Sequence, residues 1–184
     1  MTRMLTACFV SLWAAAFFSN ALATQVEYVS PRQMGEESAL VVRGRVESVR
    51  SFWNESHTKI LTETVIQVDE TYKGGAEGTV RVLQLGGVVD HMRVHVHGAL
   101  IWHGGEEVLL FLDRMDGGDY RVAGFSQGKL DIERDPVTGN AYIKRPAAEG
   151  AEVLGAPPAD EQVVVTGPVR MPLDEFVNQA LGRK

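Results

Sequence analysis

Residues 58–70, TKILTETVIQVDE, decide the fold of this chain. Every second residue of this stretch, from Thr58 to Val68, is threonine, isoleucine or valine. These β-branched side chains lose rotamer freedom in a helix and pack well on a pleated sheet. The stretch therefore predicts a β-strand that directs one face toward a hydrophobic core.

The segment before this strand alternates in the same way. Residues 39–50 place Leu40, Gly44 and Val46 on one face of an extended chain. Because a glycine inside a strand is typical of a bulge or bend, Gly44 is predicted to mark the point where this strand curves. Residues 52–57 are predicted to join the two strands as a hairpin loop.

The rest of the chain continues to alternate between apolar runs and turn residues. Further strands are predicted at residues 79–85, 89–97, 107–113, 120–124, 129–133 and 141–144. The run Val108–Leu112 is apolar without interruption, which is typical of a strand covered on both faces. Within 89–97, the spacing of Met92, Val94 and Val96 predicts that these three side chains face the core.

Two short helices are predicted at the ends of the strand-rich region. Ser30 is a candidate N-cap, Pro31 suits the first helical position, and Gln33 can complete a capping box. A second helix is predicted to begin near Pro172 and to end at Gly182. Its apolar stripe, which is predicted to dock on the barrel, consists of Leu173, Phe176, Val177, Ala180 and Leu181.

Many short strands with few helices predict an all-β, mainly antiparallel fold. The expected architecture is a small OB-like barrel, closed or partly open, with a short N-terminal helix and a C-terminal helix; a β-sandwich is the alternative. The expected organisation is a signal peptide at 1–23, a barrel domain at 24–145, an Ala/Pro/Gly/acidic linker or long loop at 146–161, and a short strand (163–165) with the terminal helix at 162–184.

The first residues have the features of a secretory signal peptide. Arg3 supplies the positive charge, residues 5–18 are largely apolar, and Ala21 and Ala23 provide the small residues of a cleavage site. Cleavage after Ala23 is therefore expected, with export to the periplasm or the medium. Two alternatives fit less well: a lipoprotein box ending at Cys8 leaves almost no apolar segment before it, and a membrane anchor needs about 20 apolar residues.

Charge and cysteine content restrict the partners and the chemistry. The chain has 18 basic and 24 acidic residues, for a net charge of −6; without Arg3 it becomes 17 − 24 = −7. Such an acidic balance argues against nucleic acid as a partner. Cleavage also removes Cys8, the single cysteine, so the mature protein is expected to lack disulfides, thiol nucleophiles and cysteine-bound metal.

Five segments between about residues 39 and 133 carry a resemblance: Leu40–Val46, the threonine-rich strand that ends at Tyr72–Gly74, Gly86–Gly87, Gly104–Leu112 and Gln127–Lys129. Together they resemble an uncharacterised family of secreted bacterial β-barrel proteins. In outline the chain is also similar to the OB-like barrels of netrin-like and metalloproteinase-inhibitor domains. The resemblance implies a barrel and export, but the inhibitors reach zinc through an N-terminal cysteine that this mature chain lacks.

Four histidines lie within a short stretch and are candidate metal ligands. In a strand over 89–97, His95 and His97 would share the outer face about 6.5 Å apart, with His91 or His103 as a third ligand. Arg93 on the same face would repel a cation. Zinc or copper are the expected ions, because imidazole suits both. The alternative is that these histidines are ordinary polar residues of an exposed strand face.

Other motifs have simpler interpretations. Gly124–Gly128 has the G-x-S-x-G pattern of a hydrolase around Ser126, but a strand is predicted after it and no histidine follows as a base. Three further groups remain open: calcium ligands at Asp113, Asp116 and Asp119, a glycosylation sequon at Asn54, and an aromatic contact patch of Phe52, Trp53 and Trp102.

The function predicted from these features is a non-enzymatic, exported barrel that binds a protein or peptide, with no cofactor. An exported zinc- or copper-binding protein using the histidines is the second hypothesis. A serine hydrolase at Ser126 is the third.

Overall fold

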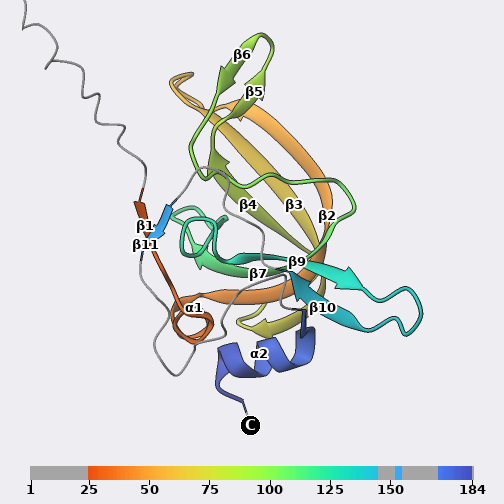
Figure 1. Cartoon of the computed structure of the whole chain (residues 1–184). Helices are drawn as coiled ribbons and strands as arrows, with labels where there is room; N and C mark the ends of the chain where they lie inside the picture. The colour runs from red at the N-terminus through yellow and green to blue at the C-terminus, as the bar shows by residue number, and fades with distance from the viewer. Residues whose placement is uncertain (1–24, 145–151, 155–169, 184) are drawn as a thin grey trace, which may run out of the picture.

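The computed structural model describes residues 25–144, 152–154 and 170–183 (Figure 1). These residues form one large sheet, two small two-stranded sheets and two short helices. The predicted short strand at 163–165 lies outside the described residues. In the part of the chain that the structure describes, no helix is both long enough and apolar enough to cross a membrane.

Five strands close into a barrel. They are β2 (Leu40–Trp53), β3 (Ile60–Lys73), β4 (Thr79–Leu85), β7 (Glu107–Arg114) and β8 (Tyr120–Val122). The ring is complete because β7 pairs with both β2 and β8, while β8 also pairs with β4. All of these pairings are antiparallel except β4 with β8. The prediction of an all-β, mainly antiparallel barrel is confirmed.

The sheet also extends beyond the barrel from the edge of β7 that faces away from β2, where β9 pairs before β8 does. The added strands are β9 (Lys129–Arg134), β10 (Ala141–Lys144) and β12 (Met171–Pro172). Figure 1 shows β9 and β10 projecting from the barrel as a hairpin. Because β12 joins this extension, the segment before the C-terminal helix is tied to the sheet by main-chain pairing as well as by helix packing.

The long strand β2 bends at Gly44, as predicted from the sequence. The pairing of β2 with β3 shifts register between Arg43 and Gly44, and again between Val46 and Ser48. A side chain on Gly44 would place its Cβ 2.4 Å from the carbonyl oxygen of Gln67. Glycine therefore allows the two strands to approach closely where the barrel wall curves.

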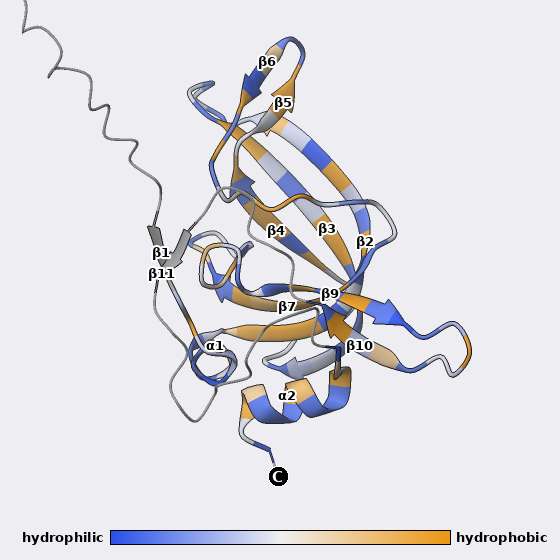
Figure 2. Ribbon diagram, viewed as in Figure 1, coloured by the Kyte–Doolittle hydropathy of each residue, from blue (hydrophilic) through white to orange (hydrophobic). Residues whose placement is uncertain are grey.

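Two hydrophobic cores lie on opposite sides of the sheet, and β7 contributes to both. Val108, Leu110 and Leu112 belong to the cluster inside the barrel, whereas Leu109 and Phe111 belong to the cluster between the sheet and the helices. This division explains the uninterrupted apolar run, because both faces of β7 are covered. Figure 2 shows the same strand as almost continuously hydrophobic, whereas β2 and β3 alternate.

The two helices pack together against the outer core. Helix α1 (Pro31–Glu37) begins as predicted, since the Ser30 hydroxyl accepts a hydrogen bond from the Gln33 backbone N–H. The Gln33 side chain binds Glu37 instead of completing the capping box. Helix α2 (Leu173–Leu181) buries the predicted stripe, except that Leu181 is only partly covered, and Pro172 is its N-cap. Figure 2 shows the apolar side of α2 toward the sheet.

The predicted strand over 89–97 is wrong. A short hairpin replaces it, formed by β5 (Gly87–Val89) and β6 (Met92–Val94). Met92 and Val94 are exposed rather than core-facing, because the hairpin projects from the end of the barrel opposite α2 (Figure 1). Alternation predicts that a segment has two distinct faces, but it does not say whether another part of the molecule covers one of them.

One further pairing involves the region predicted as a linker. Residues 152–154 form β11, which runs parallel to β1 (Gln25–Glu27) at the N-terminal end of the described chain. The remainder of the predicted linker lies outside the described residues.

Candidate functional site

A pocket lies where β4 and β8 diverge. The two strands pair at Val82 and Tyr120, whereas β8 pairs with β7 along its whole length, from Tyr120 opposite Arg114 to Val122 opposite Leu112. The wedge between the separating strands encloses a cavity of about 370 Å³. This volume lies at the lower end of the range for ligand pockets in proteins.

Three segments form the walls of this cavity, which we call the β4–β8 pocket. They are the end of β4, the chain that returns from the β5–β6 hairpin, and the region around β8. The lining residues are Val82, Leu83, Gln84, Leu85, Val96, Gly98, Ala99, Leu100, Asp113, Arg121, Val122, Gly124 and Phe125. Most of the side chains among them are aliphatic or aromatic, so the pocket favours an apolar group.

Gln84 fixes the returning chain against β4. Its side-chain amide donates to the carbonyl of Leu100 at 2.9 Å, and its carbonyl oxygen accepts from the indole N–H of Trp102 at 3.2 Å. The indole itself is buried in the inner core. The wall opposite β4 is therefore held by hydrogen bonds and by core packing.

Two large apolar side chains remain exposed on the pocket walls. Leu85 is 51 % exposed and Phe125 is 46 % exposed. Phe125 also has a φ of 66°, a left-handed conformation that bulky residues rarely adopt. The surrounding turn holds this conformation through hydrogen bonds from Ser126 N–H to the Gly124 carbonyl and from Gly128 N–H to the Ala123 carbonyl. Strain of this kind gathers at binding sites, where the surrounding structure maintains it.

An ion pair supplies the polar part of the pocket lining. Arg121 Nε lies 3.5 Å from Asp113 Oδ2, and both side chains are partly exposed. Asp119, which the sequence grouped with Asp113 as a calcium ligand, instead binds Arg81 at 2.6 Å. Each of these two carboxylates is thus paired with an arginine. Among the described residues, no group of three His, Cys, Asp or Glu side chains is arranged to hold a metal ion.

The structure brings two of the candidate histidines together. The rings of His95 and His97 meet edge to face, with centroids 5.2 Å apart, and both residues are exposed. They follow β6 rather than lying within it. His103 instead contacts Glu106, with its Nδ1 3.5 Å from Glu106 Oε2. A zinc or copper site at His95 and His97 stays a prediction.

The aromatic residues do not form one contact patch. Trp102 is only 9 % exposed, and Lys129 Nζ lies 5.3 Å from the centre of its ring. Phe52 instead lies under the guanidinium of Arg50, and Trp53 stacks on His57 in the loop between β2 and β3.

Ser126 lies in the turn between β8 and β9, and its surroundings differ from those of a hydrolase nucleophile. The residue is 6 % exposed, and β9 follows this turn. A nucleophile elbow needs an accessible serine at the start of a helix. The glycines at 124 and 128 here serve a turn between two strands.

Asn54, the residue of the predicted sequon, organises the loop between β2 and β3. Its side-chain oxygen accepts from the backbone N–H groups of Thr58 and Lys59, both at 2.8 Å. Its amide nitrogen donates to the hydroxyl of Ser56. A glycan on this nitrogen would displace a side chain that shapes the loop.

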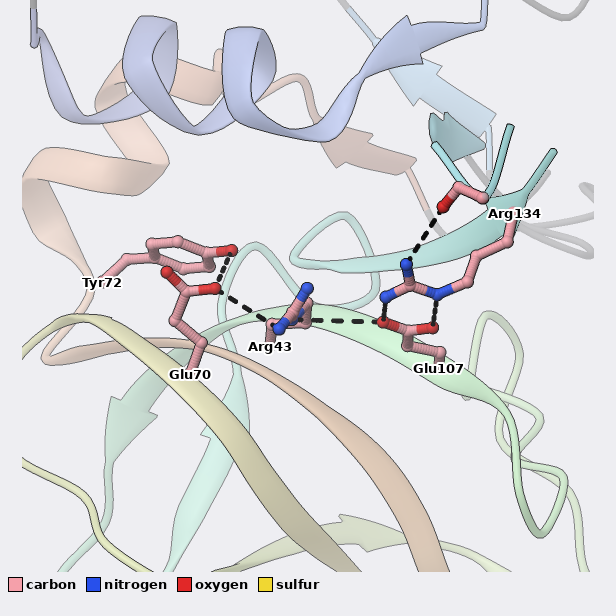
Figure 3. Close-up of polar contacts among 6 residues, drawn as sticks. Arg43, Glu70, Tyr72, Glu107 and Arg134 are labelled. Atoms are coloured by element: carbon pink, nitrogen blue, oxygen red, sulfur yellow. Dashed lines mark hydrogen bonds and ion pairs between the residues drawn. The ribbon is translucent and has the colours of Figure 1, made fainter. Parts of the chain in front are cut away.

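A second polar cluster ties four strands together on the outer face of the barrel (Figure 3). Arg134 on β9 donates two hydrogen bonds to the carboxylate of Glu107 on β7, at 2.6 and 2.8 Å. Arg43 on β2 lies between Glu107 and Glu70, and Tyr72 donates to Glu70 at 2.9 Å. Burial and the hydrogen bond to Glu70 raise the pKa of Tyr72. Because these charges already bind one another, we assign this cluster to the sheet's stability.

The charge of Glu107 predicts a pH-dependent contribution to stability. The hydrogen bonds from Arg134 hold the pKa of Glu107 below the ordinary glutamate value, although burial opposes this shift. A carboxylate with a lowered pKa in the folded state stabilises the protein at neutral pH, and this contribution disappears as pH falls through the lowered pKa. We expect Glu107→Gln to cost about 1–2 kcal/mol at pH 7 and much less near pH 3.

Urea unfolding of both proteins at the two pH values measures this difference. Glu55→Gln, in the exposed loop between β2 and β3, is the control and should leave stability unchanged at both. An equal cost of Glu107→Gln at pH 7 and pH 3 would show that the ionised carboxylate contributes nothing.

No protein-family model matches the chain, and no curated protein matches it.

The β4–β8 pocket was not predicted from the sequence, although two local features accompany it. One is Phe125, which follows Gly124 in a turn, and the other is Leu85, the last residue of its strand. Both features are common in loops and at strand ends, so neither predicts a pocket without knowledge of the neighbouring walls.

Proposed function

We propose that the protein is an exported binding module that holds an apolar part of another protein or peptide in the β4–β8 pocket. The observation that carries this proposal is a preformed, mainly apolar cavity of about 370 Å³ with Leu85 and Phe125 exposed on its walls. Interfaces of this kind gain most of their binding energy from large apolar side chains that fill pockets.

Export rests on the sequence of residues 1–23, with cleavage after Ala23 and delivery to the periplasm or the medium. We also infer that the barrel is OB-like. A five-stranded barrel that one short parallel pairing closes fits that class. The acidic net charge of −6 favours protein over nucleic acid as the partner.

Binding is favoured over catalysis because the candidate nucleophile is poorly placed. Ser126 is buried and lies before a strand. The pocket, by contrast, combines shape and apolar surface, which are the requirements of recognition.

Selection of peptides from a random displayed library on the purified, exported protein tests the proposal. We expect enriched peptides to contain large apolar residues. Phe125→Asn is expected to weaken their binding at least about tenfold, the effect of losing about 1.4 kcal/mol of contact. Asparagine tolerates the left-handed backbone at this position, so the change removes the ring without straining the turn.

Val137→Thr is the matched control, because Val137 is 91 % exposed and lies in the turn between β9 and β10. It should bind the enriched peptides as the wild type does. Two results would refute the proposal: a library that yields no enriched peptide, or peptides that bind Phe125→Asn with unchanged affinity.

A further inference from the structure

We propose that the partner binds as an extended strand that adds to the free edge of β4 in the β4–β8 pocket. This inference rests on the proposed function and specifies its binding mode. The occupant is a peptide segment, because its main chain would pair with β4 while its apolar side chains fill the cavity.

The hydrogen bonds of β4 show which backbone groups face the pocket. Gly86 N–H donates to the Ile60 carbonyl, and Val68 N–H donates to the Gly78 carbonyl. Both bonds continue the register of β3 with β4, in which Leu61 lies opposite Leu85. In an antiparallel pair, residues bond to the neighbouring strand at alternate positions. The N–H and C=O groups of Leu83 and Leu85 therefore point away from β3.

On the side of β4 that faces away from β3, β8 covers only part of the strand edge. Its pairing with β4 is at Val82 and Tyr120, and Leu83 and Leu85 follow Val82 along the pocket wall. Among the described strands, none pairs with β4 beyond Val82 on this side. The carbonyl of Leu83 and both main-chain groups of Leu85 are thus available to an added strand.

This edge also lacks the charged residues and prolines with which proteins often protect a free strand. The exposed edge of the sheet extension is β12, which contains Pro172, and the neighbouring β10 ends in Lys144. Proline and lysine discourage pairing with another chain. Residues 83–85 are Leu-Gln-Leu, with no charge and no proline. The contrast indicates an edge that is kept open for a partner.

The pocket suits the side chains of such a strand. Val82 and Gln84 lie on the barrel side of β4. Val82 belongs to the inner core, and Gln84 accepts a hydrogen bond from the indole of Trp102, which belongs to the same core. Leu83 and Leu85 therefore lie on its outer side, since side chains alternate along a strand. A strand paired with β4 would direct alternate side chains to these two sides. We infer a peptide with large apolar residues at alternate positions.

N-methylation of the enriched peptides, one residue at a time, tests strand addition. An N-methyl group removes one donor and obstructs pairing, so binding should fall about tenfold or more at every second central residue and little at the residues between. Amide hydrogen exchange gives a second measure on the protein. The Leu85 amide should exchange at least about tenfold more slowly in the complex, while the amides of β10 keep their rates.

The two proposals fail in different ways. Strand addition is wrong if N-methylation has no alternating effect and the Leu85 amide is not protected, even though Phe125→Asn still weakens binding. That result leaves the pocket as the binding site, occupied through side chains alone. If the enriched peptides ignore Phe125→Asn, the proposed function fails, and the binding mode fails with it.

Discussion

Replacement of Phe176 by alanine is expected to lower the free energy of unfolding by about 3 kcal/mol. Phe176 is 4 % exposed, and its ring meets that of Phe111 edge to face with centroids 6.3 Å apart. Phe111 lies on β7, at the centre of the sheet, so the contact joins the C-terminal helix to the barrel wall. The truncated side chain would leave a cavity between elements that other contacts hold apart.

Urea unfolding monitored by tryptophan fluorescence and by circular dichroism measures this effect. Gln179→Ala is the control, since Gln179 lies on the exposed face of the same helix and alanine favours helix formation. It should change stability by less than about 0.5 kcal/mol. Equal stabilities of the two variants would mean that α2 does not dock on the barrel as described.

Replacement of Gly44 by alanine is expected to cost about 2–3 kcal/mol, the upper part of the range for overpacking. The added Cβ would lie 2.4 Å from the Gln67 carbonyl oxygen and 2.7 Å from Cγ2 of Ile66. The first contact involves the backbone of β3, which cannot move without disturbing the pairing on which the barrel depends. The strands must separate at the bend, and the inner core must then repack.

Gly75→Ala provides the matched comparison. Its Cβ would have no neighbour within 4 Å, and its backbone is not in the left-handed region. Alanine there should be neutral or stabilise by up to about 1 kcal/mol, because it reduces the entropy of the unfolded chain. If Gly44→Ala unfolds at the same urea concentration as Gly75→Ala, the close approach of β2 and β3 is not as tight as the structure has it.

Most elements of the barrel could be predicted from local patterns because those patterns report burial. The alternation in 58–70 predicts β3, and the unbroken apolar run 108–112 predicts a strand covered twice. Burial follows a period of two in a strand and 3.6 in a helix, so residues close in sequence carry this information. The same reasoning failed at 89–97, where the pattern is present but Met92 and Val94 are exposed.

The candidate site could not be predicted in this way. The histidines near residue 95 can be recognised in the sequence by their residue type, whereas the β4–β8 pocket has no distinctive residue type. Its walls come from β4, the chain after β6 and the region of β8, which are distant in sequence. Their proximity depends on the pairing of β8 with both β7 and β4.

The sequence by itself therefore determined the main strands of the barrel, the bend at Gly44 and the buried stripe of α2, because each depends on neighbours along the chain. The tertiary structure alone decided the closure of the barrel, the divergence of β4 from β8 and the free edge at Leu83–Leu85. The physical reason is that main-chain hydrogen bonds have the same chemistry at every residue. Which of them remain free is settled only when all strands have taken their partners.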